Sequence, residues 1–233
     1  TVKRVAQELG GKSANIGFAD SDLEAAVTRG VHHCFENAGQ SCNAPTRMLV
    51  PRDLYPAVAK LAVETAQQLS VGMPSGNADL GPIANQNQYR RVVSLIEQAI
   101  AENCELLIGG PDCPDDLKPG LFVCPTIFGN VTPDKTIANE EVFGPVLAIM
   151  PYDTVEEAIR IANDTPYGLS GQVWGKDHPA AVAVAARLRT GMVHVNGAPL
   201  DSAAPFGGYK MSGLGREWGV HGLEEFPEIK SVY

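Results

Sequence analysis

The residue best suited by type and setting to covalent chemistry is Cys42. It lies in the polar run 37–45, where its immediate neighbours are glycine, glutamine, serine and asparagine. A structural cysteine normally packs among apolar side chains, and these neighbours can neither continue a core stripe nor shield a sulfur from substrate. The turn also lies between a predicted helix and a predicted strand, which would hold it at both ends. This setting predicts a nucleophile, with an ordinary exposed thiol as the alternative.

A carboxylate, Glu8, ends a predicted strand over 2–9 that Gly10 and Gly11 close. Catalytic and ligand-binding groups of α/β sheets collect at strand ends. A single glutamate beside a turn is also typical of a solvated surface. Glu8 is therefore a candidate site residue, with a plain surface charge as the alternative.

The remaining cysteines are expected to be inert. Cys34 falls on the buried stripe of a predicted helix, and Cys104, Cys113 and Cys124 have no convergent histidine or carboxylate partners. Five cysteines are an odd number without the short paired spacing of a zinc site, and they are too sparse for a disulfide scaffold. We therefore expect no metal and a reducing, cytoplasmic setting.

Composition restricts the class of protein. The chain has 233 residues, 44% of them hydrophobic, with no apolar run long enough to span a membrane, which predicts a soluble globular protein of one large domain, or one domain and a fragment. A formal charge of -9, scattered along the chain, argues against a nucleic-acid surface and a polybasic membrane patch. Because Thr1 is not an initiator methionine, we expect a processed, trimmed or expressed fragment.

The order of elements predicts the fold class. After the helix that contains Cys34, strands alternate with helices, which is typical of an α/β fold with a mostly parallel sheet flanked by helices. Strands are predicted over 13–18, 46–50, 105–108, 146–152, 170–174 and 192–195 and around Phe122, and helices over 54–69, up to 101, and over 154–163 and 178–188.

The C-terminal part is rich in turns. Four glycines fall in the thirteen residues 205–217, which indicates tight turns and close backbone approach. No strand precedes Gly213 and Gly215 and too little chain follows them, so a nucleotide-binding fingerprint is rejected there. The alternating stretch 228–233 predicts an edge strand or a subunit contact.

Five segments together resemble the NAD(P)-dependent aldehyde dehydrogenase superfamily. They occur in the order seen in that family, Cys42 follows Glu8 by 34 positions as it does there, and the resemblance covers nearly the whole chain. The segments are 8–12 (ELGGK), 39–42 (GQSC), 140–146 (EEVFGPV), Asn163 with 167–169 (YGL), and 205–217 (PFGGYKMSGLGRE).

The resemblance implies a mechanism. Cys42 would attack an aldehyde carbonyl to give a thiohemiacetal, which passes hydride to the nicotinamide and becomes a thioester. Sulfur acts as thiolate, so local dipoles are expected to lower the pKa of Cys42. Glu8 would be the general base for the hydrolytic water, with its pKa raised by partial burial. The amide of Cys42 is the implied oxyanion donor, a group that contributes roughly 3 kcal/mol.

The resemblance also implies a cofactor site and a substrate site. Glu141 would receive the ribose hydroxyls of NAD or NADP, and Phe143 would pack near the nicotinamide riboside. Leu9 and Gly10 would form the backbone beside the ring. Phe206 and the loop before it would line the aldehyde tunnel. The expected partners are a small-molecule aldehyde and further copies of the chain in a homo-oligomer, with no nucleic acid and no membrane.

The same resemblance implies a domain division. Residues 1–10 would be the end of a nucleotide-binding domain that is otherwise missing from the chain. Residues 11–222 would form the catalytic domain, and 223–233 a terminal strand used in oligomerisation. The missing domain would supply most of the cofactor contacts and the asparagine of the oxyanion hole.

Two other functions stay open. An acylating relative would hand the thioester to coenzyme A and would not need a base, so the presence of Glu8 speaks against it. A non-catalytic fragment with a structural or oligomeric role is the alternative from a different class, and the missing amino-terminal half supports it.

Because most cofactor contacts would lie outside the chain, we predict that this polypeptide alone binds NAD(P) weakly and turns over aldehydes little or not at all. Isothermal titration of the isolated chain with NAD measures this directly. A micromolar dissociation constant would contradict the expectation.

Overall fold

The computed structural model describes residues 2–112 and 114–233, so Cys113 lies outside the described residues. Within them, seven strands form one sheet in the order β4-β5-β6-β3-β2-β7-β8, and two short strands, β1 (Gln7–Glu8) and β9 (Gly213–Leu214), pair separately. The sheet strands are β2 (Ala14–Gly17), β3 (Arg47–Pro51), β4 (Glu105–Ile108), β5 (Thr126–Gly129), β6 (Val146–Tyr152), β7 (Gly171–Trp174) and β8 (His194–Val195).

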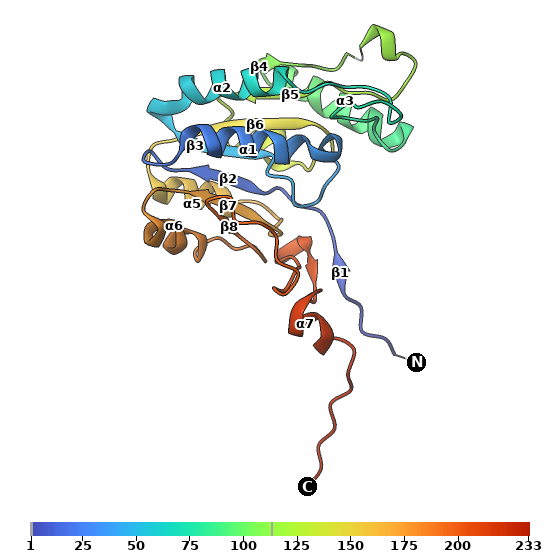
Figure 1. The fold of residues 1–233 in the computed structure, drawn as a ribbon, viewed down its shortest axis with the longest axis vertical. Coiled ribbons are helices and arrows are strands. Elements are labelled where there is room, and N and C mark those ends of the chain that lie inside the picture. The colour runs from blue at the N-terminus through green and yellow to red at the C-terminus, as the bar shows by residue number, and fades with distance from the viewer. Residues whose placement is uncertain (1, 113) are drawn as a thin grey trace.

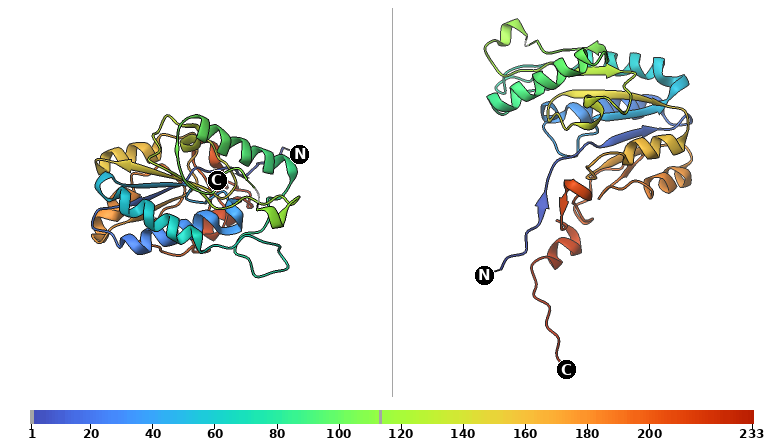
Figure 2. Two further views of the ribbon diagram at one scale, coloured as in Figure 1. Left: turned by 90° about the horizontal axis from the view of Figure 1, so that it is seen from above. Right: turned by 180° about the vertical axis from the view of Figure 1, so that it is seen from behind.

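Helices cover both faces of this sheet. Helices α1 and α2 lie on one face and α3 and α5 on the other (Figure 1 and Figure 2). Asp22, Asn85, Thr154 and Asp177 cap α1, α3, α5 and α6 by accepting a hydrogen bond from a backbone amide in the first turn. The helices are α1 (Leu23–Phe35), α2 (Tyr55–Gln67), α3 (Gln86–Ala101), α4 (Thr136–Asn139), α5 (Val155–Asn163), α6 (His178–Ala185) and α7 (Gly219–Glu224).

The sheet is parallel except at one edge, where β4 runs antiparallel to β5. Its central strands carry apolar side chains on both faces because both faces are covered, and Ile16, Leu49 and Ile149 are fully buried. The predicted α/β class with a mostly parallel sheet is therefore confirmed. Within the described residues, no helix has the length and apolar character needed to span a membrane.

The strand predictions around Phe122 and over 2–9 were wrong. Phe122 lies in irregular backbone, and the strand forms four residues later as β5; the side chain of Phe122 is buried, so its apolar character reflects core packing rather than pairing. The expected strand 2–9 is reduced to β1, which pairs with β9 and not with the main sheet. Residues 2–6 are exposed and join no ladder.

The two ends of the chain leave the sheet layer on the same side (Figure 1 and Figure 2). The segment 223–233, expected as a strand, begins inside α7 and forms no strand. Its apolar side chains face solvent, with Phe226 84% and Ile229 96% exposed.

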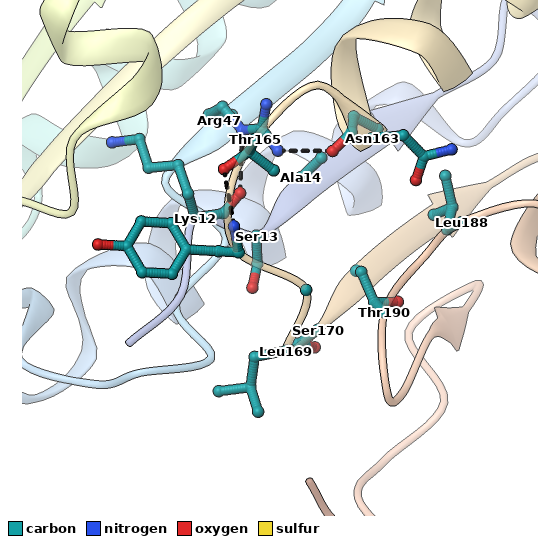
Figure 3. Close-up of a pocket in the computed structure, with 14 residues that line it drawn as sticks. Lys12, Ser13, Ala14, Arg47, Asn163, Thr165, Leu169, Ser170, Leu188 and Thr190 are labelled. Atoms are coloured by element: carbon teal, nitrogen blue, oxygen red, sulfur yellow. Dashed lines mark hydrogen bonds between the residues drawn. The ribbon is translucent and has the colours of Figure 1, made fainter. Parts of the chain in front are cut away.

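A buried arginine joins three elements at the amino end of β3. Arg47 is 2% exposed, and its guanidinium donates to the carbonyls of Lys12, Ile161 and Ala162 at 2.8–2.9 Å. Figure 3 shows Arg47 beside Lys12. Burial lowers the pKa of Arg47 to about 10. Because these carbonyls lie before β2 and at the end of α5, one side chain fixes both elements to β3.

Replacing Arg47 with methionine keeps most of the side-chain volume but leaves three buried carbonyls without a donor. We expect Arg47→Met to lower the free energy of unfolding by about 3–5 kcal/mol, measured by urea denaturation. Arg90→Met on the exposed face of α3 is the matched control and should change it by less than about 0.5 kcal/mol. Equal effects of the two substitutions would contradict the role given to Arg47.

Candidate active site

The register of the parallel strands gathers the predicted site residues. Ala14 in β2 pairs with Arg47 in β3, and Arg47 pairs with Ala148 in β6. Glu8, Cys42 and Glu141 lie six, five and seven residues before these three positions. Since parallel strands start at the same edge, the three segments converge there.

This edge is the amino end of the strands. Sheets of this class usually bind ligands at the carboxyl end, and that rule was the reason for placing Glu8 at a strand end. The reason for that placement was wrong, because Glu8 belongs to β1, outside the main sheet, and lies in the segment that precedes β2.

The turn that carries Cys42 is held in an unusual backbone conformation. After α1, the 3₁₀ segment Glu36–Gly39 places Asn37 and Ala38 at φ values of 52° and 54°, and Gly39 follows at 70°. A Cβ at Gly39 would lie 2.1 Å from the carbonyl oxygen of Gly144, so only glycine fits. This contact packs the Cys42 turn onto the segment that carries Glu141.

Two further glycines bring the three segments into contact. The amide of Gly11 donates to Oε1 of Glu141 at 2.9 Å. A Cβ at Gly11 would lie 2.1 Å from the carbonyl oxygen of Cys42, and one at Gly10 would lie 2.2 Å from Oε2 of Glu141. The segment Gly10–Gly11 therefore passes between Cys42 and Glu141, and it can do so only without side chains.

Cys42 is half-buried, and burial raises the pKa of its thiol. The amides of Cys42 and Asn43 lower this pKa, while the charges of Glu141 and Glu8 raise it further. The expected net lowering is thus not found: the local dipoles act in the predicted direction, but burial and two carboxylates outweigh them.

Glu8 is also partly buried, and among the described residues its Oε2 has no hydrogen-bond partner. Burial and the charge of Glu217 raise the pKa of Glu8, and Arg216 lowers it. The glycine-rich segment 205–217 forms its surroundings: Gly207 lies against Oε1, where a Cβ would come within 2.9 Å, and Gly213 pairs with Glu8 in the β1–β9 ribbon. Sequence reasoning missed this contact, although the density of glycines in 205–217 signalled close backbone approach.

Lys12 is a second residue that sequence reasoning left without a role. It is 2% exposed, and burial with the neighbouring charge of Arg47 lowers its pKa to about 7, against the opposing effect of Glu141. Glu141 is half-buried, and burial raises its pKa while the Gly11 amide, Lys12 and Arg91 lower it. A lysine that directly precedes a buried strand was the available signal.

The other predicted residues lie as follows. Leu9 is 47% exposed next to Glu8, and its amide donates to the carbonyl of Ser212. Phe143 lies two residues after Glu141 at a φ of 53°, a conformation rare for an aromatic residue. Phe206 packs on Trp218 with ring centroids 4.9 Å apart.

Two further expectations concerned the role of Cys34 and a metal site. Cys34 is fully buried and burial raises its pKa to about 12, which confirms its place in the core. Among the residues that the structure describes, no three histidine, cysteine or acidic side chains are grouped as a metal site.

The charges around Cys42 predict its pH dependence. Alkylation by iodoacetamide should follow the thiolate, with a midpoint above the ordinary cysteine value of about 8.5. Glu8→Gln removes a negative charge that raises this pKa, so the midpoint should move to lower pH and the rate at about pH 8 should increase. Rates come from mass spectrometry of the Cys42 peptide. An unchanged or higher midpoint in the variant would contradict the proximity of the two groups.

The close approach of Gly11 gives a packing prediction. Gly11→Ala must displace the Cys42 carbonyl, and we expect it to lower the free energy of unfolding by about 1–3 kcal/mol in urea denaturation. Gly81→Ala is the control, because its Cβ would meet nothing within 4 Å. If Gly11→Ala were as stable as the control, the described packing of Gly11 on Cys42 would be wrong.

Known proteins match this chain over its whole length. A 3-succinoylsemialdehyde-pyridine dehydrogenase from a Pseudomonas species is 54% identical over 233 residues, which are 100% of this chain and 49% of that protein. A putative aldehyde dehydrogenase from Staphylococcus aureus is 45% identical over 99% of this chain and 49% of its own length. The chain thus spans about half the length of these curated relatives.

Solved structures agree with the fold. A cysteine-to-alanine mutant of aldehyde dehydrogenase C from Pseudomonas syringae, in complex with NAD+ and octanal, is 50% identical with a TM-score of 0.94, over 97% of this chain and 47% of that one. An aldehyde dehydrogenase from Mycobacterium tuberculosis in complex with NAD+ is 45% identical with a TM-score of 0.92, over 95% and 46%. The sequence profile described as the aldehyde dehydrogenase family matches residues 1–232, and the chain therefore belongs to that family.

Proposed function

We propose that this chain is the catalytic part of an enzyme that oxidises an aldehyde to a carboxylic acid with NAD or NADP. Cys42 is the nucleophile and Glu8 the general base. The observation that carries the proposal is the convergence of Glu8, Cys42 and Glu141 at one sheet edge, where Gly11 contacts both the Cys42 carbonyl and the Glu141 carboxylate. Membership of the family supports it.

The first step is addition of sulfur to the carbonyl carbon. The Cys42 thiol loses its proton, the thiolate forms the C–S bond, and the carbonyl oxygen takes the negative charge. Glu8, whose pKa is raised by burial, is a nearby acceptor for the thiol proton. The amide of Cys42 is the proposed donor to the oxygen.

One residue assigned to the cofactor, Glu141, has a carboxylate oxygen available to it. Glu141 is half-buried, with Oε1 held by Gly11, while among the described residues Oε2 accepts no hydrogen bond and is available to a ribose hydroxyl. Phe143, Leu9 and Gly10 are proposed to contact the nicotinamide end. The bound cofactor supplies a hydride acceptor. Two neighbouring structures contain NAD+, which favours NAD over NADP for this chain.

The last step is hydrolysis of the acyl group on Cys42. Glu8, having released the thiol proton to solvent, takes a proton from water while the water oxygen attacks the acyl carbon. The C–S bond then breaks to release the acid and the thiolate, and Glu8 returns its proton to the thiolate. A partly buried carboxylate suits this role, because desolvation and Glu217 bring its pKa closer to neutrality.

We also propose a domain division, partners and a location for the chain. We assign residues 1–10 to the end of a nucleotide-binding domain, 11–222 to the catalytic domain, and 223–233 to an oligomer contact, because solvent-exposed apolar side chains such as Phe226 and Ile229 favour burial against another chain. The proposed partners are small aldehydes, with Phe206 near their path. The proposed location is the cytoplasm, where the thiol stays reduced.

An activated ester tests the proposal without any cofactor. Attack of Cys42 on p-nitrophenyl acetate forms the same kind of acyl thioester without hydride transfer. We predict a burst of p-nitrophenolate of about one equivalent, then slower turnover, in the unchanged chain and in the control Cys104→Ser. Cys42→Ser should abolish the burst. Glu8→Gln should keep it and lower the later rate by about 10²–10⁴-fold.

The same assay separates the alternatives. An acylating enzyme would need coenzyme A for the slow phase, and a non-catalytic fragment would show no burst that depends on Cys42. Either result would overturn the hydrolytic assignment.

A further inference from the structure

The turn that carries Cys42 needs support from the rest of the structure. Asn37 and Ala38 both have a positive φ, a conformation that is uncommon for a residue with a side chain and that persists only where the surroundings hold it. One attachment is the close packing of Gly39 on the next segment of the site. A second attachment is made by the side chain of Gln40, two residues before Cys42.

Gln40 uses both ends of its side-chain amide. Its Nε2 donates to the carbonyl of Asn37 at 3.1 Å and to the carbonyl of Pro82 at 3.3 Å, and its Oε1 accepts from the amide of Ala84 at 2.8 Å. Asn37 returns the contact, because its Nδ2 donates to the carbonyl of Gln40 at 3.0 Å. The amide group of Gln40 therefore binds one backbone group inside the turn and two in the segment 82–84.

The segment 82–84 is a firm anchor for this contact. Ile83 is 2% exposed, and its amide donates to the carbonyl of Leu121 at 2.8 Å. Asn85 follows directly and caps the start of α3. Since a buried side chain and the start of a helix fix this segment, Gln40 joins the turn to the core of the molecule.

Helix α3 also supports the segment 141–143. Two of its side chains, Gln88 and Arg91, donate to backbone carbonyls of that segment at 2.8–3.1 Å. Through Gln40, the turn that carries Cys42 is attached to the same helix. One element thus places two of the three segments that meet at the site.

The chemistry of the amide group restricts which residue can make this attachment. Glutamate can accept from Ala84 but has no donor for the carbonyls of Asn37 and Pro82, and methionine has the length of glutamine with neither a donor nor a strong acceptor. Asparagine is one methylene shorter. Only glutamine carries a donor and an acceptor at this distance from the backbone.

We propose that Gln40 is a positioning residue for Cys42, which holds the turn against residues 82–84 so that the thiol and the backbone amide of Cys42 address the same carbonyl group. This inference rests on the proposed nucleophilic role of Cys42. Sulfur must attack the carbonyl carbon while the amide donates to the oxygen, and a displacement of about 1 Å can cost about 100-fold in rate. Alkylation by iodoacetamide forms no oxyanion and needs only an accessible thiolate.

Comparison of these two reactions tests the proposal. The acylation rate constant from the p-nitrophenyl acetate burst is divided by the rate constant of iodoacetamide alkylation at the same pH, which cancels the fraction of thiolate. We expect this ratio to fall about 10–100-fold in Gln40→Met and less in Gln40→Glu, which keeps the acceptor for Ala84. Gln67→Met, the same change at an exposed position of α2, is the matched control and should leave the ratio unchanged.

An unchanged ratio in Gln40→Met would overturn the proposal. Equal slowing of both reactions would also overturn it, because a loss of stability or of access to the thiol affects the two reactions alike.

Hydrogen exchange tests the attachment without any catalysis. The amide of Ala44 donates to the carbonyl of Ser41 at 3.2 Å across Cys42, and its exchange, measured by NMR, should be at least about tenfold faster in Gln40→Met than in Gln67→Met. Equal exchange would show that the turn keeps its shape without Gln40. The two proposals can fail separately, since the absence of a burst that depends on Cys42 in the unchanged chain would refute the catalytic role, and the exchange rates would still decide whether Gln40 fixes the turn.

Discussion

The site depends on the parallel register of β2, β3 and β6. This register aligns the starts of three strands that are far apart in sequence, and each strand is preceded by one site segment. Arg47 supports the alignment by binding the carbonyl of Lys12, just before β2, and two carbonyls at the end of α5. Because the segments enter at the amino edge, their geometry follows from the sheet rather than from flexible loops at its carboxyl end.

The cost of this arrangement is the burial of charge. Glu8, Glu141 and Lys12 all lie in or beside the site, Lys12 buried and the two glutamates partly buried, and each has a pKa displaced toward its neutral form. The thiol of Cys42 shares that environment. Burial and the charges of Glu141 and Glu8 raise its pKa, so they disfavour its ionisation. Glycines at positions 10, 11 and 39 make the burial possible, since each lies where a side chain would meet another segment.

The fold class and the positions of several strands could be predicted from the sequence. The fold class follows from strand-helix alternation, and strands such as Glu105–Ile108 and Val146–Tyr152 were placed to the residue because apolar runs there end at turn residues. The strand around Phe122 failed because burial alone does not imply pairing. The raised pKa of Cys42 could not be foreseen, since it depends on two carboxylates brought in by tertiary structure. The contact of segment 205–217 with Glu8 also depends on tertiary structure, so the sequence indicated it only through the density of glycines in that segment.

The central claim is that Glu8 and Cys42 lie within electrostatic reach of each other across one site. The most direct measurement is the pKa of the Glu8 carboxyl group by carbon NMR before and after modification of Cys42. Carboxymethylation adds a negative charge and should raise the pKa of Glu8, whereas the neutral carbamidomethyl group should raise it less. Identical titration of Glu8 in the two modified forms would show that the two groups are apart and would contradict the account.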